Sequence, residues 1–317
     1  MTAPAVRAFA TKLRSRGIVR VQGADSLKFL QGLITNDMHH ICNNHTKALS
    51  APFLNGRGRV LFGTIIQRQH ENDYLIDVSR AQVPNLISHL TKFRLRAKVH
   101  VSDQSDSHAV WAVVNSTSGS TDRDSRLFED PRLEALGLRA IVDEGFTPPP
   151  DVTTADEDEY ERVRILNGVP DGSDFDETPL PLDLGLHLLN GVSFSKGCYL
   201  GQELTARSHF TGVLRKRITP VIITEQAPLG ARGADRGMVS DDAELRLPSG
   251  AELFLEGKNK PAGRVTSSVD NIGMAVLRLS DIFSTQGTNE LRLQDGRLVT
   301  AWKPPWWRER TNEAAAQ

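Results

Sequence analysis

Cysteine is the scarcest chemically useful residue in this chain. The 317 residues include only two cysteines, Cys42 and Cys198. Two thiols are too few for a disulfide framework, and the sequence has no C-x-x-C pair and no Cys/His spacing of a closed zinc site. The chain is therefore expected to work in a reducing compartment, and each thiol has to be judged by its own surroundings.

Strong net charge and long apolar runs are missing as well. The formal net charge is −1, which gives no global field for nucleic acid. No apolar run approaches the roughly 18 residues that a membrane-spanning helix needs. No glycine-rich phosphate loop follows a strand, so a nucleotide fingerprint is also missing. What remains is an ordinary globular composition, 39% hydrophobic and 24% charged, with neither nucleic acid nor a membrane span expected.

The N-terminal segment has no acidic residue before Asp25. This composition is typical of an organelle-targeting segment, and the apolar centre of a secretory signal is missing. Residues 1–16 are therefore predicted to be the remnant of a mitochondrial transit peptide, with a short basic surface helix as the alternative. The basic residues concerned are Arg7, Lys12, Arg14, Arg16 and Arg20.

Periodicity predicts an α+β chain that ends in a β-barrel. The Asn55-Gly56 turn is expected to lead into one long buried strand up to residue 68. After about residue 225, short strands separated by Gly, Asn and Asp turns are typical of a small barrel. Further strands are expected at 17–23, 73–79, 97–103, 109–115, 263–269, 273–279, 289–294 and 297–303. Helices are expected at 24–36, 82–95, 158–168 and 203–209. The predicted domains are 17–225, 226–305 and a tail at 306–317.

Cys198 lies in the stretch SKGCYLGQELT, directly before an expected helix. The unpaired N–H groups and the dipole of a helix N-terminus, together with Lys196, favour a thiolate. Gly197 and Gly201 are expected to allow tight turns that side chains would block. Gln202 and Glu203 fall in the first turn, where an acid suits the dipole. The stretch therefore predicts a reactive, accessible thiol; a small buried hydrophobe is the alternative for a lone cysteine.

Simple counting limits what this thiol can do with a metal. An iron–sulfur cluster typically takes four protein ligands, most of them cysteines. Cys42 and Cys198 cannot complete such a set, so any cluster is expected to be transient and shared with a partner protein. A nucleophilic thiol enzyme would instead need a base, for which His187 and His209 are the neighbouring candidates. Cys42 lies in HHICNNH, residues 39–45, where an exposed polar loop is expected.

The octet K-G-C-Y-L-G-Q-E, Lys196 to Glu203, resembles the signature of the folate-binding iron–sulfur assembly factors. These are relatives of the glycine-cleavage aminomethyltransferase, namely the bacterial YgfZ type and its mitochondrial counterpart. The continuation GVLRKR is more similar to the mitochondrial branch. The resemblance implies a GcvT-like ring of two α+β subdomains, here within 17–225, plus the C-terminal β-barrel. Weaker similarity runs through 23–37, 53–66, 92–103, 164–172 and 262–268.

The resemblance also implies a function. The chain, a monomer when alone, would help to mature 4Fe–4S proteins in the mitochondrial matrix together with A-type scaffold proteins. Cys198 would ligate a transient 2Fe–2S cluster shared with that partner, or would assist its transfer. The supporting residues that carry over are Lys196, Gly197, Tyr199, Gly201, Gln202, Glu203 and Arg207.

The sequence departs from the aminomethyltransferases of this superfamily. Where those enzymes carry an acidic pair, this chain has Phe62 and Gly63, and Leu166 stands where a glutamate holds the pterin ring. Without these groups the proton chemistry and the paired hydrogen bonds of that reaction are missing. Asp183 and Gly185 also replace a usual Glu and Asn. The chain is thus expected not to be an aminomethyltransferase. The alternatives are a tetrahydrofolate-dependent one-carbon transferase and, third, a redox module that pairs Cys198 with Cys42.

Overall fold

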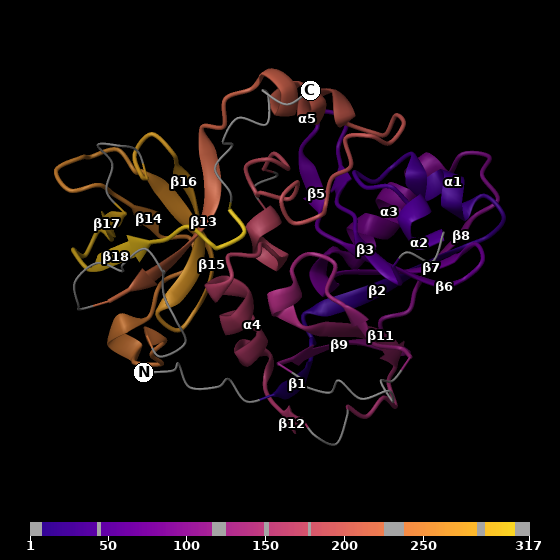
Figure 1. Cartoon of the computed structure of the whole chain (residues 1–317), viewed down its shortest axis with the longest axis horizontal. Helices are drawn as coiled ribbons and strands as arrows, with labels where there is room; N and C mark the ends of the chain where they lie inside the picture. Colours follow the sequence, from indigo (N-terminus) through magenta and orange to yellow (C-terminus); the bar gives the residue numbers. More distant parts are fainter. Residues whose placement is uncertain are drawn as a thin grey trace.

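The computed structural model describes residues 8–42, 46–115, 125–148, 152–176, 179–224, 238–283 and 289–307. Two five-stranded sheets and one six-stranded sheet organise these residues. Figure 1 shows the six-stranded sheet on one side of the molecule and the two five-stranded sheets on the other, with α5 (Gln202–Thr211) along the top edge between β13 and β5. This arrangement confirms the predicted α+β class with its C-terminal barrel.

The first five-stranded sheet is antiparallel and has the strand order β3-β6-β7-β2-β8. Two of its inner strands, β2 and β7, are buried over almost their whole length, as is typical of a sheet that is covered on both faces. Val19, Ile76, Leu86 and Leu90 belong to its core. The strands are β2 (Arg16–Gln22), β3 (Ala48–Ser50), β6 (Ile65–His70), β7 (Asp73–Ser79) and β8 (His100–Asp103), and the helices are α1 (Ser26–Gln31), α2 (His39–Cys42) and α3 (Val83–Arg94).

The second five-stranded sheet has the order β10-β11-β9-β1-β12, and α4 (Glu157–Leu166) contacts β1. Its first strand corrects a prediction. Residues 9–12, which composition assigned to a targeting segment, form β1 between β9 and β12, and Arg16 is buried. Residues 8–16 therefore belong to the fold. Residues 1–7 lie outside the described ranges, and the origin of the segment as a transit peptide stays a prediction. The strands are β1 (Phe9–Lys12), β9 (His108–Val114), β10 (Phe128–Glu129), β11 (Leu138–Asp143) and β12 (Thr153–Thr154).

The six-stranded sheet curls into a nearly closed barrel. Its order is β14-β15-β16-β13-β18-β17, and the backbones of Phe254 and Arg292 exchange hydrogen bonds of 2.9 and 2.8 Å across the remaining gap. The sheet begins at Lys216, ahead of the boundary expected at residue 226; the division into domains stays a prediction. The strands are β13 (Lys216–Ile223), β14 (Glu252–Leu253), β15 (Gly263–Val269), β16 (Ile272–Arg278), β17 (Glu290–Arg292) and β18 (Leu298–Ala301).

Two predicted elements are wrong in length. The helix expected over 24–36 ends at Gln31, because the side chains of Thr35 and Asn36 donate to the carbonyls of Gly191 and Asn190 instead of continuing a helix. The long strand expected up to residue 68 is broken. β5 (Val60–Phe62) pairs with β4 (Phe53–Leu54). After Gly63 and Thr64 the chain enters β6, which pairs with β3 in a different sheet.

A buried ionic network joins the two five-stranded sheets. Arg16 on β2 donates to Asp77 and Asp171, each at 2.5 Å, and Arg132 donates to Asp130 and Asp171 at 2.7 Å. Arg139 on β11 also belongs to the network, because its Nε donates to Oδ2 of Asp77 at 2.8 Å. Three arginines and three aspartates balance in charge, and the Tyr160 hydroxyl accepts from Arg132 and Arg139. The chain segments that surround the ring centre are therefore coupled by charge as well as by packing.

Among the described residues, no helix has both the length and the apolar character needed to cross a bilayer.

Candidate functional site

Cys198 is exposed and lies in the loop that leads into α5. The helix begins at Gln202, so the thiol stands before the helix rather than in it, while Gln202 and Glu203 occupy the first turn as predicted. Tyr199 and Gln202 tie loop and helix together: the Tyr199 N–H donates to Oε1 of Gln202 at 3.2 Å, and the Gln202 N–H donates to the Tyr199 carbonyl at 3.3 Å. Burial raises the pKa of Tyr199 to about 12, so its hydroxyl stays protonated.

Lys196 holds this loop against the end of α1. Its ammonium donates to the backbone carbonyls of Gln31, Ile34 and Asn36 at 2.7, 2.8 and 2.7 Å. These three charge-assisted bonds use all three ammonium protons. Lys196 thus fixes the loop in place. The sequence did not predict this role, because backbone carbonyls occur in every residue and give no sequence motif. The expected influence of Lys196 on the Cys198 thiol stays a prediction.

Backbone contacts extend this attachment along the whole loop. The Ser193 and Leu200 N–H groups donate to the carbonyls of Thr35 and Gly32, both at 3.0 Å. The Thr35 hydroxyl returns a bond of 2.6 Å to Gly191. Residues 191–200, which carry the thiol, are therefore fixed at several points to a segment some 160 positions earlier in the chain.

Gly201 meets the turn that follows β4. It has a φ of +81°, and a Cβ at this position would lie 2.3 Å from the Asn55 carbonyl oxygen and 3.1 Å from the Gly58 Cα. The predicted need for glycine is therefore confirmed at Gly201. It is wrong at Gly197, where a Cβ would have no atom within 4 Å. The same contact places the turn that carries the exposed residues Arg57 and Arg59 beside Gly201, a neighbourhood that the sequence did not predict.

The other thiol has different surroundings. Cys42 ends α2, so the polar loop expected there is partly a helix; residues 43–45 lie outside the described ranges. It is half-buried, and its Sγ lies 3.6 Å from the Tyr74 hydroxyl. Burial raises the pKa of Tyr74. Both cysteines are free thiols, and a redox pairing between them stays a prediction without support in the geometry.

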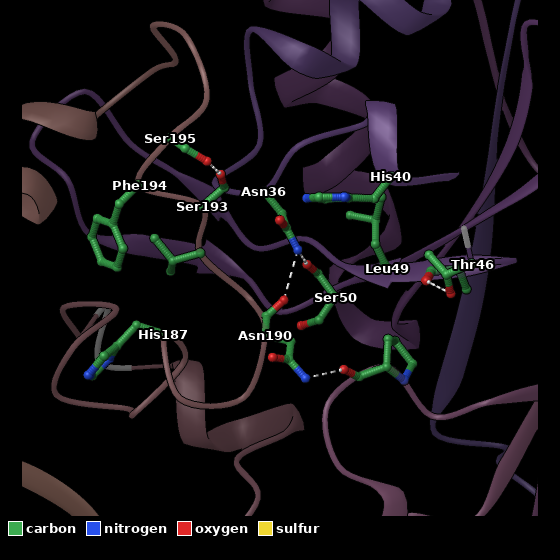
Figure 2. Close-up of a pocket in the computed structure, with 13 residues that line it drawn as sticks. Asn36, His40, Thr46, Leu49, Ser50, His187, Asn190, Ser193, Phe194 and Ser195 are labelled. Atoms are coloured by element: carbon green, nitrogen blue, oxygen red, sulfur yellow. Dashed lines mark hydrogen bonds between the residues drawn. The ribbon is translucent and has the colours of Figure 1, made fainter. Parts of the chain in front are cut away.

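The two histidines near the motif belong to an aromatic cluster. The His187 and His209 rings lie 6.3 Å apart, and His209 stacks on Phe194 at 3.7 Å. Phe194 and His187 also line one end of a cavity of about 480 Å³, with His40 and Thr46 at the other end (Figure 2). Asn36, Ser50, Asn190, Ser193 and Ser195 supply amide and hydroxyl groups, so this cavity is polar but has no Asp, Glu, Lys or Arg in its lining.

An aromatic ring fills the position that the resemblance matches to the acidic pair of the aminomethyltransferases. A Cβ on Gly63 would lie 2.4 Å from the Phe175 ring, and the space beside them is a cavity of only about 20 Å³. Leu166 packs with Ile165 and Phe175 in an apolar cluster. These residues offer neither a proton-transfer group nor hydrogen-bond partners for a pterin edge.

Metal-ligating side chains do not gather elsewhere in the part of the chain that the structure describes. No group of three or more His, Cys, Asp or Glu side chains there could hold an ion.

Lys196 leads to a prediction for the dependence of stability on pH. Burial lowers its pKa from 10.5 to about 8, against the attraction of Asp37. Between these values the unfolded chain still binds a proton that the folded chain has released. The free energy of unfolding is therefore expected to rise with pH through this interval, and the burial cost is fully present at pH 7.

The measurement is urea unfolding at several pH values for the wild type and for Lys196→Met, together with an NMR titration of the lysine side chains. The variant should lack this rise in stability. A Lys196 signal that titrates with the exposed lysines above pH 10 would contradict the expectation.

The ring of sheets and barrel defines a class of protein. The structure is similar to that of the glycine cleavage system aminomethyltransferase T from Bartonella henselae, with a TM-score of 0.69, 14% sequence identity, and coverage of 95% of this chain and 86% of that chain. At that identity the similarity shows the aminomethyltransferase fold alone. Residues 215–309 match the family model of the CAF17 C-terminal β-barrel domain.

Sequence relatives narrow the class to a family. The chain is 33% identical to "Iron-sulfur cluster assembly factor IBA57 homolog, mitochondrial" of Mycosarcoma maydis, over 93% of this chain and 84% of that protein. The IBA57 proteins of Mus musculus and Homo sapiens are 33% and 32% identical with the same coverage. The chain therefore belongs to the IBA57 family of iron–sulfur cluster assembly factors. The resemblance predicted from the octet is confirmed, and these relatives are named mitochondrial.

Proposed function

We propose that this chain assists the maturation of 4Fe–4S proteins in the mitochondrial matrix, as a monomer that joins an A-type scaffold protein. The observation that carries the proposal is the setting of Cys198. Its thiol is exposed, yet its loop is fastened by the three bonds of Lys196 and by the contact of Gly201 with the Asn55 turn. A single fixed, accessible thiol suits a shared ligand, because a shared site needs one side chain held in position for the other protein.

In this proposal the cluster is cargo. A transient 2Fe–2S cluster would be held by Cys198 and by ligands of the partner. The Cys198 thiol would give up its proton to solvent when its sulfur bonds to iron, so ligation itself changes no oxidation state. Lys196, Gly201, Gln202 and Tyr199 would position the loop. Glu203 and Arg207, both exposed on α5, would face the partner, and Gly197 would leave the approach to the thiol open.

The alternative of a tetrahydrofolate-dependent transferase finds less support. The Phe175 ring against Gly63 and the cavity of about 20 Å³ leave no room for a pterin at that position. The larger cavity beside Phe194 has no carboxylate for proton transfer in its lining. We therefore propose assembly without one-carbon turnover.

The test is cluster reconstitution of this chain with an A-type scaffold protein, followed by visible absorption and native mass. The wild type and Cys42→Ala are expected to give a coloured heterocomplex. Cys198→Ala should give a colourless heterocomplex or coloured scaffold protein alone. Cys42→Ala is the matched control because it removes the other thiol. A coloured heterocomplex that survives with Cys198→Ala would contradict the proposal.

A further inference from the structure

Exposed apolar side chains gather next to the Cys198 loop. Five large apolar side chains are exposed among the described residues, and three of them, Phe194, Phe210 and Val213, lie in this loop and at the end of α5. Phe210 is 69% and Val213 is 84% exposed. Exposed apolar groups scattered singly need no explanation, but a group of them side by side marks an interaction site.

The aromatic members form one continuous surface. Phe194 stacks on His209 at 3.7 Å, its ring lies 6.3 Å from that of Phe210, and His209 meets Phe210 edge-on at 4.9 Å. We call Phe194, His209, Phe210 and Val213 the α5 patch. Phe194 also lines the cavity of about 480 Å³ with its amide and hydroxyl groups (Figure 2). The patch therefore continues into a pocket that can accept hydrogen-bonding groups.

Positive charge flanks this patch. Arg207 on α5, Arg215 and Lys216 after it, and Arg57 and Arg59 on the turn against Gly201 are all exposed. Glu203 is the one exposed acid within residues 190–216. Residues 190–216 thus carry four lysines and arginines against one acid, whereas the whole chain has a net charge of −1. Asp183, which is partly buried, lies within electrostatic reach of Arg59 and Lys216 and offsets part of this charge.

We propose that the α5 patch and its cationic flanks are a docking surface for a protein partner whose contacting segment combines an apolar side chain with carboxylates. This inference rests on the proposed function, because the surface adjoins the loop of Cys198. Charge complementarity would steer the partner, and the patch would supply the desolvated centre of the interface. Docking would thus bring the two sets of cluster ligands together before any cluster is present.

Two other occupants fit less well. A second copy of this chain across a two-fold axis would oppose arginines to arginines, which costs energy at close range. A single-stranded nucleic acid needs open aromatic faces for stacking, but His209 already covers one face of Phe194, and Val213 is aliphatic. The amide and hydroxyl lining of the adjoining cavity matches peptide groups instead.

The test measures binding without cluster. Apo A-type scaffold protein is titrated into the full chain by calorimetry at low and at high ionic strength. Val213→Asp is expected to weaken binding by about tenfold or more, the equivalent of losing one well-buried contact. The matched control is Leu95→Asp, because Leu95 is 88% exposed but lies after α3. This control should bind like the wild type.

A second pair of variants tests the charge. Arg215→Glu is expected to weaken binding and to reduce its salt dependence, whereas Arg96→Glu, an exposed arginine near Leu95, should do neither. Cys198→Ala should retain apo binding in full, which separates this inference from the proposed function. Equal affinities of Val213→Asp and Leu95→Asp would overturn the inference. The inference would also be overturned if the wild type formed no complex with the apo scaffold protein. Self-association or oligonucleotide binding that Val213→Asp abolishes would overturn it as well, because the patch would then serve another occupant.

Discussion

Replacing Asp171 with asparagine is expected to lower the free energy of unfolding by about 3–5 kcal/mol, the range measured when one partner of a buried ion pair is removed. Asp171 accepts from Arg16 at 2.5 Å and from Arg132 at 2.7 Å. An asparagine keeps a similar shape but no charge, so both guanidinium groups would lose a counter-ion inside the ring. Urea unfolding at pH 7 measures the difference.

The matched control for Asp171→Asn is Asp295→Asn. Asp295 also accepts from an arginine side chain and a backbone N–H, both of Arg297, but its side chain is half exposed. Water and salt screen such a pair, so a loss below about 1 kcal/mol is expected. Equal effects of the two substitutions would show that burial does not strengthen the ionic network.

Lowering the pH should reduce the difference in the free energy of unfolding between the wild type and Asp171→Asn. Burial alone would raise the pKa of Asp171, but attraction by Arg16 and Arg132 outweighs it and lowers the pKa far below its usual value. The stabilisation is therefore present above the unfolded-state pKa of about 4 and is lost as the pH falls below it. The variant should lose less stability than the wild type between pH 7 and pH 3. A constant difference across this range would contradict the assigned role.

Gly201→Ala is expected to destabilise the protein by about 2–4 kcal/mol and to displace the Cys198 loop. The positive φ alone costs an alanine about 1–2 kcal/mol, and the added Cβ would clash with the Asn55 carbonyl. Because that carbonyl belongs to the backbone of a tight turn, either the turn or the loop has to move.

Gly197→Ala is the control within the same motif, since a Cβ there meets no atom within 4 Å. It should leave the midpoint of thermal unfolding and the rate of Cys198 alkylation almost unchanged, whereas Gly201→Ala should change both. If the two variants behaved alike, the contact between Gly201 and the turn would not be what positions the loop.

Elements with a strong local pattern could be predicted from the sequence. The apolar runs in β2 and β7, the apolar stripe of α3 and the short strands β15 and β16 depend on neighbours in the chain. The octet around Cys198 likewise identified the family. These features share one property: the information lies within about ten residues.

Features that depend on distant partners could not be predicted. β1 is a strand only because β9 and β12 lie beside it. Arg16 resembles a basic residue of a targeting segment in the sequence, and only the structure shows that it is paired with Asp77 and Asp171. The acceptors of Lys196 are carbonyl oxygens, which every residue has. Phe210 and Val213 are the exception, since apolar residues at an otherwise polar helix end are a local signal.

The bonds of Lys196 have a consequence for the order of events during synthesis. The carbonyls of Gln31, Ile34 and Asn36 leave the ribosome long before Lys196 does, and the thiol has no fixed place until the two segments meet. A nascent or truncated chain would thus present its thiol without the orientation that a shared ligand needs. Under the proposed function, the two segments would therefore have to fold against each other before Cys198 could take part in handling a cluster.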